Sequence, residues 1–371
     1  MDKVSSTGLQ DSGLRKEVRL LSLDGVRGLS ILIVVLGHIF LPERGGLAAL
    51  GVYLFFALSG YLITGILLKE IAATGNVNIG GFLIRRAWRL TPALVVFILI
   101  VVGFYVSAGL TISWLEISSA LTYTTNYLGS YLALKGDEFS MPFGVLWSLA
   151  VEEHFYLLFP ILLVFCRFNP ARILASALVV VAGCLVIRNF YYFAFPESIG
   201  KLLTYRNSDS RFDSISVGVV LAILLHRDWC AAVVQFMARQ WVVLVSLLLM
   251  VVLAMIPGQY YRETLRFSLL SLVCVPVITF GALNRVGWLS LVLRSKPLLF
   301  FGNISYSLYI WHIACIQLTH AVMGNNHSFA TGCVALLSSV LAGWCSYEFV
   351  ERRFLSIKRR RDQSIGSVVR S

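Results

Sequence analysis

The chain has 371 residues, of which 58% are apolar and only 13% are charged, and its mean hydropathy is +0.80. Soluble domains usually carry about 25% charged residues, so this chain has too little charge to cover a water-exposed surface of its size. The composition excludes an ordinary soluble protein and predicts that lipid is the solvent for much of the chain.

The net charge of +12 does not indicate a nucleic-acid partner, because the basic residues stand at the ends of apolar runs rather than in one patch. The seven cysteines form no CxxC pairs, so we expect neither a metal site nor a disulfide framework. The first 22 residues are polar and charged, without the apolar core of a signal peptide, and the first apolar run should therefore stay in the protein.

Apolar runs of about 20 residues predict membrane-spanning helices. The predicted fold class is all-α, a polytopic membrane helix bundle of about ten such helices. The ten runs are 22–41, 47–68, 91–109, 144–165, 173–191, 212–226, 240–256, 267–283, 298–320 and 329–350. The sixth run is the weakest of these, because it is short and begins with charged residues.

The distribution of lysine and arginine predicts the orientation. With the N-terminus inside, the inside segments hold 22 of the 31 basic residues and the outside segments hold eight, which places both termini in the cytoplasm. We expect a cytoplasmic segment 1–21, a membrane domain 22–351, and a basic tail 352–371 that is disordered on the anionic inner leaflet. The polar segments 110–143 and 192–211 should lie outside, as functional loops or as aromatic lids.

Three ionisable residues fall within the first run, where charge is costly and points to function. Asp24 and Arg27 are three residues apart, so they share a helix face and can pair. His38 lies eleven residues beyond Arg27 on the same face, about 16 Å farther along the helix. It is either a histidine hydrogen-bonded within the bundle or a catalytic group in the outer half of the membrane.

The fourth run begins with Trp147-Ser148-Leu149 and holds two adjacent carboxylates, Glu152 and Glu153. Glu152 should lie at a depth comparable to that of His38. A carboxylate near an imidazole can orient the ring for general-base catalysis on a hydroxyl. The structural alternative is a buried carboxylate paired with an arginine such as Arg211.

Arg86 and Arg89 precede the third run on its inner side and are three residues apart, so a helix would present both guanidinium groups to one ligand. Arginine forks match phosphate groups. Ordinary positive-inside charge is the alternative explanation. Other polar side chains within predicted spans are candidates for substrate binding or for structural roles, namely Arg211, Asp213, Tyr306, Tyr309 and His312.

These residues resemble the acyltransferase-3 family of integral membrane O-acyltransferases. The matching blocks are Leu23–Gly28 with His38, Gly51–Gly60, Arg85–Pro92, Trp147–Tyr156, Arg211–Asp213 with Gly218, Gly302–His312 and Glu348–Glu351. They extend from residue 20 to residue 355, nearly the whole chain. Each block alone is weak, whereas their order and spacing together are specific.

The resemblance implies a ten-helix bundle that takes an acyl group from cytoplasmic acyl-CoA, often acetyl-CoA, and delivers it to a hydroxyl of an extracytoplasmic sugar. The sugar would belong to a polysaccharide, a lipid-linked saccharide or another glycoconjugate. The family's catalytic histidine corresponds to His38, its paired arginines to Arg86 and Arg89, and its glutamate to Glu152. Arg27 is a further candidate, for binding the donor or stabilising the oxyanion. The resemblance also implies a multi-pass protein of the cell membrane, the inner membrane in bacteria, without a metal.

Two positions depart from the family pattern. Tyr53 stands where many members have a small acidic or other residue, and Arg353 stands where a proline usually follows the Glu-Arg pair. Neither position belongs to the expected chemistry, although Tyr53 is a candidate determinant of acceptor choice. We see no fused esterase-like domain, so we expect the membrane-only form.

Two other functional classes are open to a chain of this kind. Intramembrane acids, arginines and histidines also suit a proton-coupled transporter or a lipid-linked-sugar flippase. The chain shows no repeated halves, and only Pro160 and Pro276 are notable helix breakers, which disfavours a transporter. A sensor or scaffold with a lapsed site is disfavoured because the histidine, the two arginines and the glutamate are all present.

Overall fold

A computed structural model describes residues 5–41, 45–283, 286–324 and 328–356. The residues that the structure describes are 87% helical and contain no strand. Eight helical stretches in this part of the chain are long and apolar enough to cross a membrane, or nine if a bent pair counts as one span. The predicted all-α, polytopic membrane bundle is therefore confirmed.

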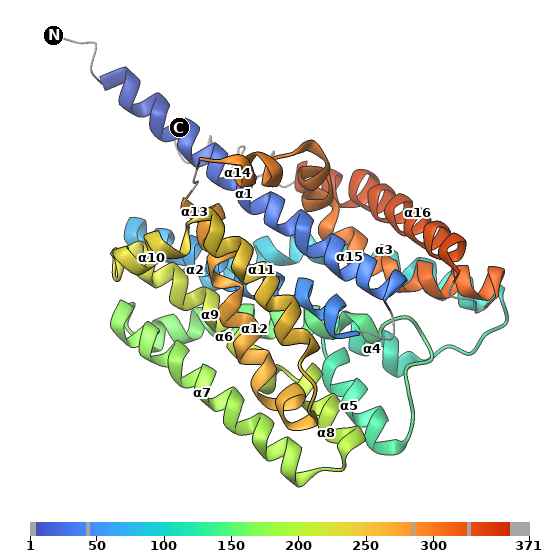
Figure 1. The fold of residues 1–371 in the computed structure, drawn as a ribbon. Coiled ribbons are helices and arrows are strands. Elements are labelled where there is room, and N and C mark those ends of the chain that lie inside the picture. The colour runs from blue at the N-terminus through green and yellow to red at the C-terminus, as the bar shows by residue number, and fades with distance from the viewer. Residues whose placement is uncertain (1–4, 42–44, 284–285, 325–327, 357–371) are drawn as a thin grey trace. The chain divides into compact units, whose positions relative to one another are not determined.

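The helices follow one another along the chain as coloured in Figure 1. They are α1 (Ser5–Phe40), α2 (Gly45–Thr74), α3 (Ile79–Ser107), α4 (Trp114–Leu121), α5 (Thr125–Lys135), α6 (Trp147–Phe165), α7 (Pro170–Ala194), α8 (Glu197–Arg206), α9 (Ser208–Arg227), α10 (Ala231–Met237), α11 (Gln240–Met255), α12 (Arg266–Val273), α13 (Val275–Leu283), α14 (Trp288–Leu293), α15 (Lys296–Met323) and α16 (Phe329–Ser346). A 3-10 turn, Gly144–Leu146, precedes α6, and π-helical turns occur at Tyr261–Leu265 and Tyr347–Glu351.

All ten predicted runs are helical, but two of them are not simple spans. The sixth run corresponds to α9, whose first turns hold Asp209, Arg211 and Asp213, and this charge keeps it out of the eight apolar stretches. The seventh corresponds to α11, which is bent by 69° relative to the preceding α10.

The third span begins earlier than predicted. Asn78 caps α3 by accepting a hydrogen bond from the Gly81 N–H at 2.8 Å, so the helix starts at Ile79 instead of residue 91. Arg86 and Arg89 consequently lie inside this helix rather than ahead of it. The predicted start was the first residue of the apolar run, whereas an N-cap specifies a helix start more directly.

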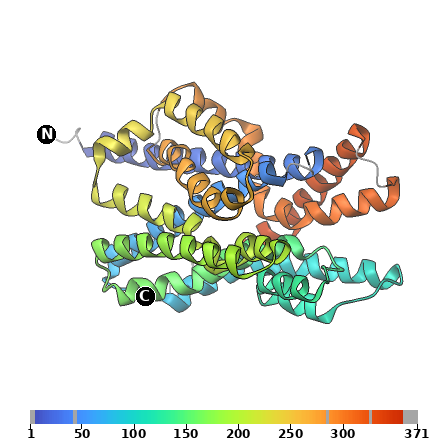
Figure 2. The same ribbon diagram turned by 60° about the horizontal axis from the view of Figure 1, so that its bottom comes forward.

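The segment 110–143, predicted to be an outside loop or an aromatic lid, contains two helices. It contains α4, which Ser113 caps through the Glu116 N–H, and α5, which ends at Gly136 with a φ of +77°. These two short helices pack against each other, α4 also packs against α3, and α5 packs against α6. They form a helical hairpin, coloured teal in Figures 1 and 2.

The described residues form two compact units. The first unit comprises described residues up to 73, 166–205 and 209–303, and the second comprises 74–165, 206–208 and the described residues from 304 onward. His38 belongs to the first unit, whereas α3, α6 and most of α15 belong to the second.

In the first unit, α1 packs along α13 and α14, and α11 packs against α12 and α13. A Cβ atom on Gly28 would lie 2.0 Å from the carbonyl oxygen of Leu298, and one on Gly302 would lie 2.1 Å from that of Asp24. Glycine therefore lets α1 and the start of α15 cross with their backbones in contact. Helices α2 and α9 cross in the same way at Gly218. These glycines belong to the sequence blocks noted above.

The ends of the membrane domain differ slightly from the predicted boundaries. Helix α1 begins at Ser5, so the expected N-terminal segment 1–21 is continuous with the first span from that residue. At the other end, the last span extends to Ser356, past the predicted boundary at Glu351. The rest of the expected basic tail lies outside the described residues.

Candidate functional site

Two predicted site residues of the second unit meet at Tyr156. The guanidinium carbon of Arg86 lies 4.2 Å from the centroid of the Tyr156 ring. The Tyr156 hydroxyl donates a hydrogen bond to Oε2 of Glu152 at 2.5 Å, one turn earlier on α6. A cation held on an aromatic face contributes on the order of 1–2 kcal/mol when it is desolvated. One buried tyrosine thus brings together the arginine block of α3 and the glutamate of α6.

Glu153 adds a second carboxylate to this cluster. Its charge interacts with those of Arg86 and Glu152. Its Oε1 atom is buried and has no hydrogen-bond partner among the described residues. A buried carboxylate oxygen of this kind can accept a hydrogen bond from a ligand or bind a proton. Arg89 is half-buried one turn along α3 from Arg86, as the three-residue spacing predicted.

His154, the next residue of α6, has a structural role. Its Nδ1 lies 2.7 Å from the Ser208 hydroxyl, which also accepts a hydrogen bond from the Asn126 side chain at 2.9 Å. Its ring stacks on Tyr127 of α5, with 5.8 Å between the centroids. The imidazole therefore ties α6 to α5 and to the first residue of α9.

Polar residues of α15 make contacts within the second unit. The Tyr309 hydroxyl lies 2.5 Å from that of Ser148, and the Tyr306 hydroxyl donates to the carbonyl oxygen of Leu90 on α3 at 2.8 Å. The fully buried His312 has its Nδ1 2.6 Å from the Tyr309 carbonyl oxygen of its own helix. Tyr306 and Tyr309 therefore help to hold α15 against its neighbours, whereas the His312 contact lies within α15.

In the first unit, the predicted pair on α1 is confirmed. Nη1 of Arg27 lies 3.1 Å from Oδ1 of Asp24, and both side chains are partly exposed. His38 is half-buried two residues before the end of α1, and its imidazole interacts with the backbone of Val34 one turn earlier. Glu152 belongs to the other unit, so the proposed contact between it and His38 stays a prediction.

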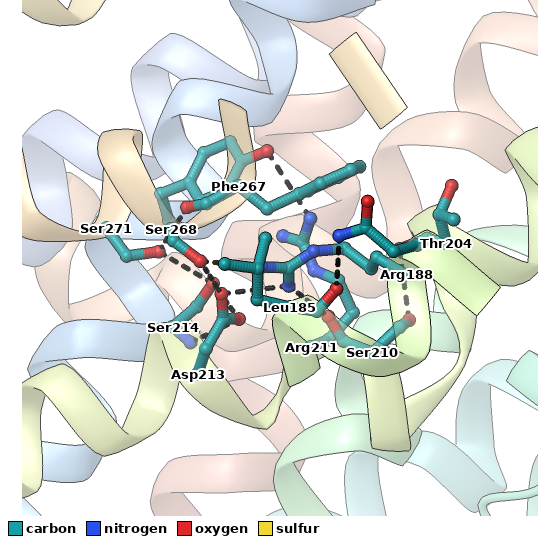
Figure 3. Close-up of polar contacts among 12 residues, drawn as sticks. Leu185, Arg188, Thr204, Ser210, Arg211, Asp213, Ser214, Phe267, Ser268 and Ser271 are labelled. Carbon is teal, nitrogen blue, oxygen red and sulfur yellow. Dashed lines mark hydrogen bonds and ion pairs between the residues drawn. The ribbon is translucent and has the colours of Figure 1, made fainter. Parts of the chain in front are cut away.

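Asp213 is the centre of a buried polar network in the first unit (Figure 3). Its Oδ2 accepts from Arg188 Nη1 at 2.8 Å and from the Ser268 hydroxyl at 2.7 Å, and its Oδ1 accepts from the Ser214 N–H at 2.7 Å. Arg188 also donates to the Ser210 carbonyl oxygen at 2.6 Å. Both charged side chains are fully buried. Sequence analysis missed Arg188 because it counted this residue among the outside basic residues.

Arg211, two residues earlier on α9, is also fully buried but lies among aromatic rings. Its guanidinium carbon is 4.5 Å from the Phe267 centroid and 4.7 Å from that of Tyr53, and its Nη1 donates to the Tyr53 hydroxyl at 3.3 Å. The rings of Phe56 and Tyr205 complete its surroundings. Tyr53, which departs from the family pattern, is therefore a direct neighbour of a predicted site residue.

The chemistry of these clusters suits an anion and a proton rather than a metal. Guanidinium groups and carboxylates lie side by side in the second unit, and the first unit buries two further guanidinium groups. In the part of the chain that the structure describes, no group of three histidine, cysteine or acidic residues could hold a metal ion.

Comparison with known proteins gives a family match over most of the chain. Residues 20–348 match the acyltransferase-3 family, which is described as an acyltransferase domain. No solved structure shows a significant match.

Two of the curated relatives that the chain matches are proteins of Staphylococcus aureus. O-acetyltransferase OatA of strain NCTC 8325 is 29% identical over 347 residues, which cover 89% of this chain and 56% of the relative. A protein of strain COL named "Putative O-acetyltransferase SACOL0978" is 28% identical over 347 residues, with 90% of this chain and 56% of the relative covered. The chain therefore spans little more than half the length of these relatives.

Proposed function

Because the chain belongs to the acyltransferase-3 family, we propose that it is a membrane O-acyltransferase. The acyl group, acetyl in the simplest case, passes from cytoplasmic acyl-CoA to a hydroxyl of an extracytoplasmic sugar in a polysaccharide, a lipid-linked saccharide or a glycoconjugate. Relatives that are named O-acetyltransferases support the acyl class. The protein resides in the cell membrane, the inner membrane in a bacterium.

The meeting of Arg86 and Glu152 at Tyr156 is the observation that supports this proposal most directly. The phosphate groups of CoA bind Arg86 and Arg89, because planar guanidinium groups bind phosphate through paired hydrogen bonds. The ring of Tyr156 holds Arg86 in one place while leaving its N–H edge available for such bonds. Arg27 is a further donor-binding candidate in the first unit.

His38 acts as the general base. It takes the proton of the acceptor hydroxyl while the hydroxyl oxygen attacks the thioester carbonyl. Collapse of the tetrahedral intermediate forms the ester, breaks the C–S bond and releases CoA, whose sulfur takes the proton from the imidazole. Glu152 is the candidate catalytic carboxylate, and Arg27 or Arg211 stabilises the oxyanion. In the alternative, the imidazole attacks the thioester, which forms an acyl-histidine and releases CoA, and the acceptor hydroxyl then displaces the histidine to form the ester.

Acyl-CoA turnover in membranes that contain the purified protein and a glycan acceptor tests this proposal. His38→Ala should lower the rate at least about 100-fold, the usual contribution of a general base. Arg86→Ala should raise the KM for acyl-CoA, whereas Arg172→Ala, at an exposed position, should leave it unchanged. Full activity of His38→Ala would end the proposed role of this histidine.

A proton-coupled transporter or flippase is the alternative, and the buried Arg188–Asp213 pair is the kind of feature that transporters also contain. A transporter would move its sugar substrate across vesicles without acyl-CoA and would leave the sugar unmodified. Mass spectrometry of surface glycans from cells with and without the protein separates the two functions, because only the enzyme adds an acyl mass.

The proposed reaction requires a fixed orientation. Both termini lie in the cytoplasm, so the Ile79 end of α3, and with it Arg86, faces the cytoplasmic donor. Reporter fusions check this arrangement. A fluorescent protein fused after residue 371 should be fluorescent, and a periplasm-dependent phosphatase at the same place should be inactive.

A further inference from the structure

Arg86 and Arg89 lie on a segment of α3 that contains a helix-weakening proline. Pro92 is inside α3, three residues after Arg89. Proline has no N–H group, so the helix lacks the hydrogen bond from residue 92 to the carbonyl of Trp88, and the proline ring also crowds that carbonyl. The segment between Arg86 and Pro92 therefore depends on its neighbours for a fixed geometry.

Two tyrosines contact α3 directly after Arg89. The Tyr306 hydroxyl donates to the Leu90 carbonyl oxygen at 2.8 Å. The Tyr123 side chain packs against the apolar cluster that contains Ala93 and Leu94 of α3, and its hydroxyl interacts with those of Thr91 and Tyr306. Consecutive residues of the weakened segment are thus held from two sides, by α15 and by the hairpin of α4 and α5.

The position of Tyr123 is unexpected, because it lies in the turn of a segment predicted to be an outside loop. Thr91 precedes the end of α3 at Ser107 by sixteen residues, or about 24 Å along the helix axis. The apolar core of a bilayer is about 30 Å thick. The hairpin therefore turns back alongside α3, and α4 packs against α3 within the second unit.

Several contacts hold this tip in an unfavourable backbone conformation. Tyr123 has a φ of +55°, a left-handed conformation that side chains such as tyrosine rarely adopt. The Thr124 N–H donates to the Ser119 carbonyl oxygen at 2.8 Å, and the His154 imidazole interacts with the backbone of Tyr123. Strained residues persist only where the surroundings fix them, and they concentrate at functional sites.

We propose that Tyr123 is a positioning residue for the arginine pair. The α4–α5 hairpin braces α3 at Thr91, and so it keeps Arg86 and Arg89 directed at the phosphate groups of the acyl donor. This inference rests on the proposed donor-binding role of the two arginines. It assigns the hairpin to the donor site rather than to an outside lid.

The test is the kinetics of Tyr123→Phe with acetyl-CoA as the donor. The variant keeps the ring and loses the hydroxyl, so the KM for acetyl-CoA should rise about 3- to 10-fold, the size expected for one lost hydrogen bond. The value of kcat should change less than the KM, because donor placement is affected and the base is not. Tyr131→Phe is the matched control, since Tyr131 lies on the same hairpin and is exposed.

A double-mutant cycle then distinguishes an effect of Tyr123 on the position of the two arginines from a general loosening of the protein. In an Arg86→Ala, Arg89→Ala background, Tyr123→Phe should raise the KM no further, because its effect acts through the missing arginines. An additional rise of the same size would overturn the inference. Thr91→Val removes the hydroxyl of α3 that Tyr123 contacts, so it should raise the KM as Tyr123→Phe does. It tests the same contact if Tyr123→Phe folds poorly.

The two proposals fail in different ways. An unchanged KM in both Tyr123→Phe and Thr91→Val, together with a raised KM in Arg86→Ala, would overturn the positioning role alone. An unchanged KM in the Arg86→Ala, Arg89→Ala background would overturn the donor site itself, and the positioning role with it.

Discussion

The guanidinium group of Arg86 lies over the face of the Tyr156 ring, with 4.2 Å between the guanidinium carbon and the ring centroid. The Tyr156 hydroxyl donates a hydrogen bond to Glu152. Two substitutions can therefore separate this hydrogen bond from the contact between the ring and Arg86. Tyr156→Phe keeps the ring beneath Arg86, and we expect the KM for acyl-CoA to stay within about twofold while kcat falls roughly 10-fold, as for one lost charge-assisted hydrogen bond. Tyr156→Leu removes both contacts and should change both constants.

Steady-state kinetics of the purified protein at varied acyl-CoA concentration measures this difference. A KM that rises equally in Tyr156→Phe and Tyr156→Leu would contradict the role of the ring. Unchanged kcat in Tyr156→Phe would show that the hydroxyl does not support Glu152 in the reaction.

The salt bridge of Arg188 with Asp213 should contribute strongly to stability, because both side chains are fully buried. Asp213→Ala leaves an uncompensated guanidinium in the interior and should lower the free energy of unfolding by about 3–5 kcal/mol. Glu348→Ala is the control, since its bridge to Arg352 is solvent-exposed and should contribute less than about 1 kcal/mol. Thermal unfolding in detergent compares the variants, and equal losses would refute the distinction between a buried and an exposed pair.

The crossing of α1 and α15 leaves no room for a side chain at Gly28. A Cβ atom there would lie 2.0 Å from the Leu298 carbonyl oxygen, so Gly28→Ala must push two backbones apart and should destabilise the fold by at least about 1–3 kcal/mol. At Gly65 on α2, a Cβ would have no neighbour within 4 Å, and Gly65→Ala should stabilise its helix by up to about 1 kcal/mol. If Gly28→Ala and Gly65→Ala shifted the melting temperature in the same direction, close backbone packing at Gly28 would be contradicted.

Sequence analysis was most successful where a pattern is local. The spacing of Asp24 and Arg27 along one helix predicted their ion pair, because residues three apart share a helix face. Long apolar runs predicted the helices, since composition alone determines whether a helix suits lipid. The blocks that contain Arg86 and Glu152 were identified separately, and the structure brings them together at Tyr156.

The features that the sequence did not reveal depend on tertiary contacts. Arg188 stands alone in its apolar run, and only the fold supplies Asp213 as its partner. The α4–α5 hairpin is short and polar, and its course is set by contacts with α3 and α6 that no periodicity predicts. The apolar run put the start of the third span at residue 91, whereas the Asn78 cap starts the helix at Ile79. The early start moves Arg86 and Arg89 into α3.

Glu116 should determine how firmly the α4–α5 hairpin is held. Its buried carboxylate accepts hydrogen bonds from the Ser140 N–H at 3.0 Å, the Ser140 hydroxyl at 2.7 Å and the Met141 N–H at 2.9 Å. In Glu116→Gln one carboxylate oxygen becomes an amide NH2, which repels an N–H donor instead of accepting from it. We expect amide hydrogen exchange at Ser140 and Met141 to accelerate at least about 10-fold, because bonds to a charged acceptor contribute roughly 1.5–3 kcal/mol each.

Glu138→Gln makes the same chemical change at an exposed position of the same loop, and it should leave the exchange rates as they are. Because the loop at Ser140 anchors α4, and α4 leads to Tyr123, the Glu116 variant should also raise the KM for acyl-CoA, by less than Tyr123→Phe does. Unchanged protection of the Ser140 and Met141 amides in Glu116→Gln would show that the carboxylate does not hold the hairpin. Faster exchange with an unchanged KM would show instead that the base of the hairpin moves independently of its tip.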